Sequence, residues 1–419
     1  MDALNNEAIQ QMNITVLSNA RVFDGESEDI RDNQSVVIEG DRIREVVDGN
    51  TSFDDADHIN CGGRFLMPGL IDAHFHAYSP TFDIQSLDRM PMSLLANHAS
   101  VLLEGALGRG FTSVRDAGGA DIGLALAIEG GLFKGPRLFF CGKALSQTGG
   151  HGDMRPGDEV EPCFCAYQGA LTTVVDGEVE VRKTVRDNLR KGATQIKLFL
   201  SGGVLSPTDP VWMPQFSEDE ILAAVEEAAT RRTYVMAHCH TDDSVRRAAE
   251  LGIRSIEHGS QISDGTAQLL AEKGSYVVPT LSVVNVLRKF GEDLGAPRKG
   301  LDEIPALYTQ MLEAIASCRN HGVSIGFGTD LFGSDFHPLQ SHEFTLRTEV
   351  DQPIDVLRSA TSVNAEILNM AGELGCIAPG AYADIILLET NPLDDFSVFE
   401  TNSQMPLIMK SGKWVRNEL

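Results

Sequence analysis

The sequence has few basic residues for its length. Its 419 residues include 34 lysines and arginines against 60 aspartates and glutamates, so the net charge is −26 and the isoelectric point lies near 4.7. Binding to a nucleic-acid backbone or to an anionic lipid surface depends on clustered lysine and arginine side chains. We therefore expect neither nucleic acid nor membranes among the partners of this protein.

Segments that would direct the chain to a membrane are also missing. No apolar run approaches the roughly 20 residues of a spanning helix, and the stretch MDALNNEAIQQMN lacks the basic and apolar regions of a secretory signal. The seven cysteines are odd in number and scattered, which is typical of reduced thiols. We expect a cytoplasmic protein. Cys163 and Cys165, in PCFC, are interpreted as loop thiols because no second pair completes a metal knuckle.

Both ends of the chain are rich in strand-forming residues. NITVLSNARVFDG and SVVIEGDRIREVV lie near the start, GAYADIILLET and MPLIMKSGKWVRN near the end, and Gly40-Asp41 between two apolar runs predicts a hairpin. Hydrophobic residues make up 42% of the chain, enough for one large domain plus a smaller one. We expect residues 1–66 and 377–419 to form one small β-sandwich domain.

Residues 67–376 have a different pattern, in which short apolar strands alternate with amphipathic helices. One helix is expected to follow Ser217, which forms a capping box with Glu220. Eight alternating strands favour a closed (β/α)8 TIM barrel over an open sheet, so the predicted α/β fold is a barrel inserted into the small domain. The strand candidates are residues 66–76, FTSVRDAGG, RLFFCG, TQIKLFLSGG, TYVMAHCH, IRSIEHG, GSYVVPTLS and GVSIGFGTD.

Histidines stand at the ends of several predicted strands. His74 and His76, in DAHFH, are two residues apart, so both imidazoles point to the same side of a strand. VMAHCH, SIEHG and GFGTD place His238, His258 and Asp330 at three further strand ends. In a barrel all these ends lie on one face, where active sites are built. Nitrogen and oxygen ligands of this kind suit zinc or a similar divalent ion.

Lys197 lies within TQIKLFL, the fourth predicted strand, among apolar residues. A lysine is rarely buried without a partner, and an ammonium beside two dications would be repelled. In one interpretation the neutral amine takes up carbon dioxide, which gives an anionic carbamate with an oxygen for each of two metal ions. In the other, the stem packs on apolar residues while the ammonium reaches water. Spacing alone does not separate the two.

Taken together, these motifs resemble those of the amidohydrolase superfamily over nearly the whole chain. The resemblance rests on PGLIDAHFH, the lysine of the fourth strand, the two later strand-end histidines, GTD, and the closing segment TSVNAEILNMAGELGCIAPGAYADIILLETNPLDD. Within the superfamily, the sequence is most similar to the Xaa-Pro dipeptidase and metal-dependent carboxypeptidase-like group, which includes ochratoxin-type amidohydrolases. The loop TGGHGD supports this placement.

The resemblance implies a binuclear metal centre with zinc as the expected ion. A hydroxide held between two ions would attack the scissile carbonyl, and Asp330 would accept its proton and deliver it to the leaving amine. The implied reaction is hydrolysis of the amide bond to a C-terminal amino acid, in a dipeptide or an N-acyl amino acid, including aromatic amides of the ochratoxin kind. The implied ligands are His74, His76 and Asp330 for the first ion, His238 and His258 for the second, and Lys197, as N6-carboxylysine, for both.

For the substrate contacts, the sequence leaves more than one role open for each candidate residue. His151, in GGHGD, and His240, two residues after His238, would face the same mouth. They could bind the C-terminal carboxylate of the substrate or help stabilise an oxyanion, or they could only orient ligands and loops. Weaker candidates are Tyr78, Ser201, His337 and His342.

Two other functions stay open at this point. One is hydrolysis of a cyclic amide or imidazolone ring, but the superfamily members that do this typically use one metal and lack the fourth-strand lysine, so Lys197 counts against it. The other is a non-catalytic scaffold, although here every ligand position is filled. Because homo-oligomers are common in the superfamily, we also expect a homo-oligomer.

Overall fold

The computed structural model describes residues 14–49, 51, 56–156, 169–206, 208–296 and 298–419. The chain divides into two compact units, which we describe separately. Met1–Gly69 and Gly372–Leu419 form the first unit, and Leu70–Ala371 forms the second. Within the described residues, no helix combines the length and the apolar character needed to cross a membrane.

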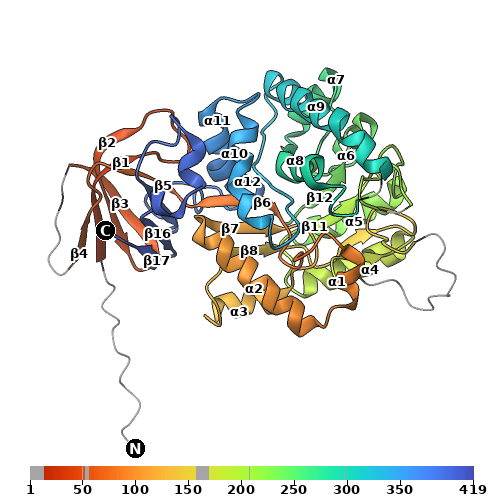
Figure 1. Cartoon of the computed structure of the whole chain (residues 1–419), viewed down its shortest axis with the longest axis horizontal. Coiled ribbons are helices and arrows are strands. Elements are labelled where there is room, and N and C mark those ends of the chain that lie inside the picture. The colour runs from red at the N-terminus through yellow and green to blue at the C-terminus, as the bar shows by residue number, and fades with distance from the viewer. Residues whose placement is uncertain (1–13, 50, 52–55, 157–168, 207, 297) are drawn as a thin grey trace, which may run out of the picture. The chain divides into compact units, whose positions relative to one another are not determined.

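The first unit contains one sheet built from both ends of the chain (Figure 1). The two ends meet where β5 pairs with β15 in antiparallel register, with Leu66 opposite Leu387. The predicted sheet from both termini is therefore confirmed, whereas its arrangement as a sandwich stays a prediction. The strands are β1 (Ile14–Val22), β2 (Arg31–Glu39), β3 (Arg42–Asp48), β4 (Asp57–Asn60), β5 (Phe65–Pro68), β15 (Ile385–Leu388), β16 (Leu407–Lys410) and β17 (Lys413–Asn417), in the order β17-β16-β15-β5-β1-β2-β3 with β4 beside β1.

Local turn chemistry explains the hairpin between β2 and β3. The two strands are joined by Gly40 and Asp41, and Gly40 has a φ of 64°, which glycine adopts without a Cβ penalty. The 3₁₀ helices η3 (Phe396–Phe399) and η4 (Asn402–Gln404) lie between β15 and β16.

The second unit alternates parallel strands with helices. β6, β7 and β8 form one sheet, and the other strands form a sheet in the order β10-β9-β11-β12-β13-β14. At the junction of the two sheets, the backbone N–H of Thr194 donates to the carbonyl of Phe140, at a distance of 2.8 Å. The strands are β6 (Leu70–Phe75), β7 (Phe111–Asp116), β8 (Arg137–Phe140), β9 (Ala144–Ser146), β10 (Thr172–Val174), β11 (Ile196–Phe199), β12 (Val235–Cys239), β13 (Ser255–His258) and β14 (Tyr276–Val278).

Helices follow most of these strands. The capping box predicted at the start of α5 is present, because Ser217 and Glu220 exchange side-chain and backbone hydrogen bonds. The helices are α1 (Ile84–Arg89), α2 (Met92–Gly108), α3 (Ile122–Glu129), α4 (Glu178–Arg190), α5 (Glu218–Thr230), α6 (Asp242–Glu250), α7 (Asp264–Lys273), α8 (Leu281–Phe290), α9 (Arg298–Asn320), α10 (His342–Arg347), α11 (Pro353–Arg358) and α12 (Asn364–Ile367), with the short turns η1 (His337–Ser341) and η2 (Ser359–Val363).

Two predicted strands differ from the structure. The strand expected at residues 66–76 is interrupted at Gly69, so that β5 pairs in the first unit and β6 in the second. The expected eighth strand, GVSIGFGTD, forms only an isolated bridge between Ile325 and Val277. The side chain of Asn364 supplies the physical reason. Its Nδ2 atom donates to the carbonyl of Ile71 at 2.7 Å and its Oδ1 atom accepts the backbone N–H of Phe327 at 3.1 Å, so the side chain bridges two backbone groups that a regular ladder would pair directly.

The alternation of side chains along β11 and β12 divides the second unit into a helix-covered core and an inner face. Ile196 and Leu198 of β11 and Ala237 of β12 pack in an apolar cluster with residues of α4 to α7. Burial of each leucine or isoleucine side chain of this kind contributes about 1.5–3 kcal/mol to stability. Because neighbouring residues in a strand face opposite sides, this packing turns Lys197 and His238 to the inner face.

Candidate metal centre

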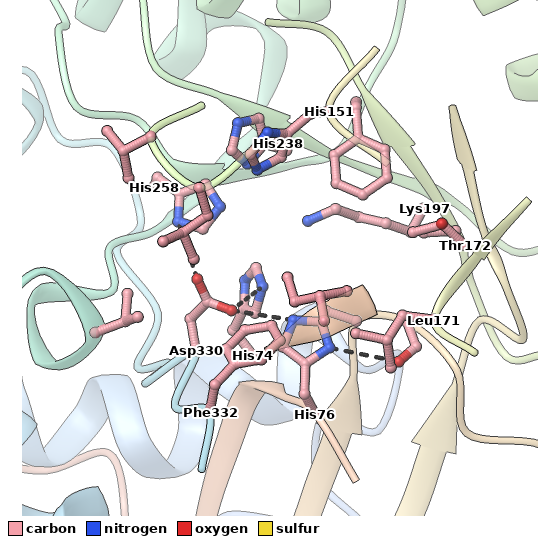
Figure 2. A pocket seen from close by; sticks show the side chains of 18 of the residues that line it. His74, His76, His151, Leu171, Thr172, Lys197, His238, His258, Asp330 and Phe332 are labelled. Atoms are coloured by element: carbon pink, nitrogen blue, oxygen red, sulfur yellow. Dashed lines mark hydrogen bonds and ion pairs between the residues drawn. The ribbon is translucent and has the colours of Figure 1, made fainter. Parts of the chain in front are cut away.

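The six predicted metal ligands come together at one end of the parallel strands. The parallel register sets Phe199 of β11 beside His238 of β12, and Cys239 of β12 beside His258 of β13. The side chains that Figure 2 labels there surround a common space. All six residues line one pocket, which we call the inner pocket: His74, His76, Lys197, His238, His258 and Asp330.

Asp330 lies at the centre of the imidazole contacts. Its Oδ1 atom is 3.0 Å from Nε2 of His76 and 3.4 Å from Nε2 of His74, and its Oδ2 atom is 3.9 Å from Nδ1 of His258. One possible ligand atom from each of His74, His258 and Asp330 lies within 4.8 Å of the others, so these three residues could hold a metal ion.

The backbone is strained at two of these residues. Asp330 has a φ of 53° and His258 a φ of 68°, values that non-glycine residues rarely adopt. The Asp330 conformation is held by its backbone N–H, which donates to the carbonyl of His74 at 2.8 Å. Strain of this kind collects at functional sites, where the surrounding structure enforces it.

A buried carboxylate orients His74. Nδ1 of His74 lies 2.7 Å from Oε2 of Glu257, whose other oxygen accepts from Arg115 at 2.9 Å and from Ser255 at 2.6 Å. Burial alone would raise the pKa of Glu257, but Arg115 and His74 lower it to about 2. The ionised carboxylate keeps the proton on Nδ1 of His74, which leaves Nε2 available as a ligand atom.

The other imidazoles are held in the same way. Nδ1 of His258 is 2.8 Å from the hydroxyl of Thr280, and Nε2 of His238 is 3.2 Å from the carbonyl oxygen of Gly202. Nδ1 of His76 is 3.4 Å from the carbonyl of Gly118. In each ring one nitrogen is thus held by a backbone carbonyl or a hydroxyl group, and the second nitrogen of His76 instead lies 3.0 Å from Oδ1 of Asp330, a candidate ligand of the same ion.

Lys197 is buried in the inner pocket. It is only 2% exposed, and among the described residues none forms a hydrogen bond or ion pair with its Nζ atom, which lies 5.7 Å from the centre of the Phe199 ring. Figure 2 shows the side chain reaching toward the space beside His238, His258 and Asp330. Burial lowers the pKa of Lys197, with Glu257 and Asp330 opposing the effect. This burial disagrees with the interpretation in which the ammonium group of Lys197 reaches water.

The donor set fits divalent metal ions. Imidazole nitrogens with fixed partners and a carboxylate are ligand groups that divalent ions accept, and an apolar core would not tolerate the buried amine of Lys197, which has no hydrogen-bond partner in the described structure. Histidine nitrogen together with carboxylate oxygen accepts zinc and several neighbouring transition metals.

His151 and His240 also line the inner pocket. Nδ1 of His151 is 2.7 Å from the hydroxyl of Ser206 and 3.4 Å from Oδ2 of the buried Asp209, and its ring stacks on His238 with centroids 4.3 Å apart. Nδ1 of His240 is 2.7 Å from the hydroxyl of Ser260.

The four weaker candidates are not among the residues that line the inner pocket. His337 is buried beside the hydroxyl of Ser79, at 3.2 Å, and His342 begins α10; neither is among the residues that line the inner pocket. Ser201 accepts the backbone N–H of His240 at 2.9 Å, and Tyr78 lines a different pocket. Cys163 and Cys165 lie outside the described residues.

Sequence reasoning missed the groups behind the candidate ligands. Glu257 directly precedes His258, and strand alternation could have placed it on the inner face. No sequence signal indicates that Arg115, on β7, reaches Glu257, because this contact joins strands that are not neighbours in either sheet.

The rest of the inner pocket is largely apolar. Its empty space is about 810 Å³, part of it open to solvent. Among the described lining residues, Lys197 is the only lysine and there is no arginine. The apolar wall comes from several segments and includes Ile84, Met154, Leu171, Val204, Leu205, Val283, Val284, Leu287, Leu307 and Phe332.

Known proteins resemble this chain in sequence and in structure. Residues 65–415 match the profile of the amidohydrolase family. The ochratoxinase of Aspergillus niger is 35% identical over 365 residues, which cover 83% of this chain and 75% of that protein. A crystal structure of a prolidase complexed with N-methylphosphonate-L-proline is 45% identical, with a TM-score of 0.93 over 97% of this chain and 100% of that one. A Xaa-Pro dipeptidase with bound methionine is 30% identical, with a TM-score of 0.87 over 97% of this chain and 100% of that one. The chain therefore belongs to the amidohydrolase family of hydrolytic enzymes.

Proposed function

We propose that this protein is a binuclear metal-dependent amidohydrolase that cleaves the amide bond to a C-terminal amino acid, in a dipeptide or an N-acyl amino acid. The observation that carries the proposal is the position of Lys197, a buried amine without a partner among the described residues, in the same pocket as His238, His258 and Asp330. The named relatives, an ochratoxinase and two proline-type dipeptidases, support an amide substrate.

A closed (β/α)8 barrel is part of the proposal. The segment 324–330 supports closure because it contacts strands on both sides. The backbone N–H of Gly326 donates to the carbonyl of Val277 at 2.8 Å, and the backbone N–H of Ala73 donates to the carbonyl of Phe327 at 2.9 Å.

We further propose that the barrel domain spans residues 67–376 and the small domain residues 1–66 and 377–419. The two compact units, which change at residues 69/70 and 371/372, support this division.

Two divalent ions, which we take to be Zn²⁺, would be held by this chain. When bound, such ions lower the pKa of water and polarise a carbonyl oxygen. The neutral amine of Lys197 would add to carbon dioxide and lose a proton, which gives a carbamate whose single negative charge is shared by two oxygens and would be stabilised by the two ions. The residues that would hold the first ion are His74, His76 and Asp330, those for the second are His238 and His258, and Lys197 would contact both.

Asp330 would move the proton during the reaction. Its carboxylate lies in the pocket beside His74 and His76, where it can accept a proton from the attacking water. The water oxygen bonds to the carbonyl carbon, the C–N bond breaks, and Asp330 returns the proton to the leaving nitrogen. The products are a carboxylic acid and a free amino acid.

His151 and His240 would bind the substrate. The C-terminal carboxylate needs a positively charged or hydrogen-bonding partner, and these two histidines line the pocket beyond the candidate ligands. His151 is the stronger candidate because its ring is held on two sides: its Nδ1 atom lies 2.7 Å from the hydroxyl of Ser206 and 3.4 Å from Oδ2 of Asp209. The apolar wall would receive the acyl part, which is compatible with aromatic amides of the ochratoxin kind.

A substrate screen with metal analysis tests the proposal. Purified protein, with and without added Zn²⁺, would be assayed against a dipeptide and N-acyl amino acid library, and its metal content measured. The expected result is close to two ions per chain and hydrolysis of members with a free C-terminal carboxylate. Ring-opening activity alone, or no hydrolysis in metal-loaded protein, would contradict it. The cytoplasmic location and the homo-oligomer stay predictions.

A further inference from the structure

A second pocket adjoins the inner pocket. We call it the outer pocket; it has about 900 Å³ of empty space, part of it open to solvent. The two pockets share four lining residues, which are Ile84, Met154, Leu205 and Leu287. The outer pocket is further lined by Phe82, Asp83, Gln85, Leu294, Gly295 and Ala296.

The four shared residues form an apolar boundary between the pockets. Ile84 begins α1, Met154 lies three residues after His151, and Leu205 lies two residues after Gly203. Leu287, in α8, is 2% exposed although it lines both pockets. None of these four side chains offers a strong hydrogen-bonding group, so a polar group placed between them would lose its hydration without compensation. This boundary therefore favours contact with an apolar chain.

The residues of this boundary are held in place by packing. Leu287 belongs to the apolar cluster of α8 and α9, and Phe82, Leu205 and Ala296 pack against the same cluster. The Nε2 atom of Gln85 donates to the carbonyl of Met154 at 2.9 Å, which ties the start of α1 to the loop after His151. A site of this kind is preformed, so a ligand would order few side chains on binding.

Charge decides which part of a substrate could lie in the outer pocket. Among its described lining residues there is no lysine, arginine or histidine, and the one acid, Asp83, caps α1 by accepting the backbone N–H of Ser86 at 3.1 Å. A substrate carboxylate would be repelled by Asp83 and would find no cation. The carboxylate end therefore belongs near His151 in the inner pocket, and the other end of the molecule points outward.

We propose that the chain of a substrate can pass between the four shared residues and that the outer pocket is a subsite for it, so that the enzyme prefers N-acyl amino acids whose acyl group is a long alkyl chain. This inference rests on the proposed function, because it takes the scissile amide to lie at the candidate metal ligands. Each further methylene that reaches the outer pocket would raise kcat/KM by about fourfold, since its burial is worth about 0.8 kcal/mol.

An acyl-length series tests the subsite. The kcat/KM values of N-acetyl-, N-hexanoyl- and N-decanoyl-L-phenylalanine would be compared in the wild type and in Leu294→Trp, which narrows the outer pocket. We expect the wild type to prefer the decanoyl substrate, and Leu294→Trp to lose roughly tenfold or more on that substrate while the acetyl substrate is unchanged. Leu132→Trp, at a position that is 83% exposed and lines neither pocket, is the matched control.

A binding measurement separates the subsite from the reaction. N-decyl- and N-ethyl-L-phenylalanine lack the scissile carbonyl, and their dissociation constants can be measured by calorimetry. Tighter binding of the decyl compound that Leu294→Trp abolishes would support the subsite even if no amide were hydrolysed, an outcome that would overturn only the proposed function. Hydrolysis without dependence on acyl length, or an equal decyl-to-ethyl ratio in wild type and Leu294→Trp, would overturn the subsite.

Discussion

Nδ1 of His74 lies 2.7 Å from Oε2 of Glu257, so a carboxylate on β13 orients an imidazole on β6. Arg115 of β7 completes the contact, because its guanidinium donates to Glu257 at 2.9 Å and to the carbonyl of Ala73 at 2.6 Å. All three side chains are buried. A candidate ligand is thus held by a charged network that spans three strands of the second unit.

Glu257→Gln should weaken metal binding. A glutamine can donate its amide N–H to Nδ1 of His74, which would move the imidazole proton to Nε2 and remove the ligand lone pair. We expect a loss of roughly 10- to 100-fold in metal affinity, measured by competition with a chelator.

The matched control for that variant is Glu227→Gln. Glu227 is also buried, but it pairs with Arg182 and Arg186 on the helix surface. The metal affinity of the Glu227→Gln variant should equal that of the wild type. Equal affinity in Glu257→Gln, with the fold intact by circular dichroism, would remove Glu257 as a positioning residue.

Lys197→Ala should reduce both metal content and activity. Without the amine there is no carbamate to contact two ions, so we expect the bound metal to fall from about two ions per chain toward one, with loss of most turnover. Elemental analysis and amide hydrolysis measure the two effects. One ion in the wild type, together with full activity in Lys197→Ala, would rule out the binuclear centre.

Asp330→Asn should separate metal binding from proton transfer. The amide keeps the size of the carboxylate and one oxygen beside His76, but it cannot accept a proton at neutral pH. We expect retained metal and a fall in kcat of about 10²- to 10⁴-fold, the range of general acid–base catalysis. Retained metal with full activity would show that another group moves the proton.

Gly203→Ala should displace His151. A Cβ atom at residue 203 would lie 2.1 Å from Cε1 of His151, far closer than van der Waals contact, so the ring must move. If His151 binds the substrate carboxylate, KM should rise roughly tenfold for N-acyl amino acids and little for their C-terminal amides.

Gly108→Ala provides the control for this substitution, because a Cβ atom there meets no atom within 4 Å. Its KM values should match those of the wild type. An equal rise in KM for acids and amides in Gly203→Ala would argue that His151 has only a structural role.

Local patterns in the sequence predicted several features that the structure contains. The hairpin at Gly40 and the capping box of Ser217 depend on residues that are adjacent or one helical turn apart, so their signals are complete in a short window. The same holds for His74 and His76, whose spacing on an extended strand already places both rings on one side.

The sequence did not predict the features that depend on packing between distant segments. The side chain of Asn364 stands between the Ile71 carbonyl and the Phe327 backbone N–H in place of a direct ladder bond, which explains why the expected strand at residues 322–330 is irregular. A glycine-rich stretch with apolar residues carries the same local signal whether backbone or side-chain groups satisfy its hydrogen bonds.

The sequence by itself indicated a set of candidate metal ligands and placed five of them on or beside strands, because residue type and strand period are local properties; these five are His74, His76, Lys197, His238 and His258. Only the tertiary structure decided that Lys197 is buried among histidines, that Glu257 and Arg115 orient His74, and that four apolar residues line both the inner and the outer pocket. These relationships join segments tens to hundreds of residues apart, and their distances are set by how the strands and helices pack.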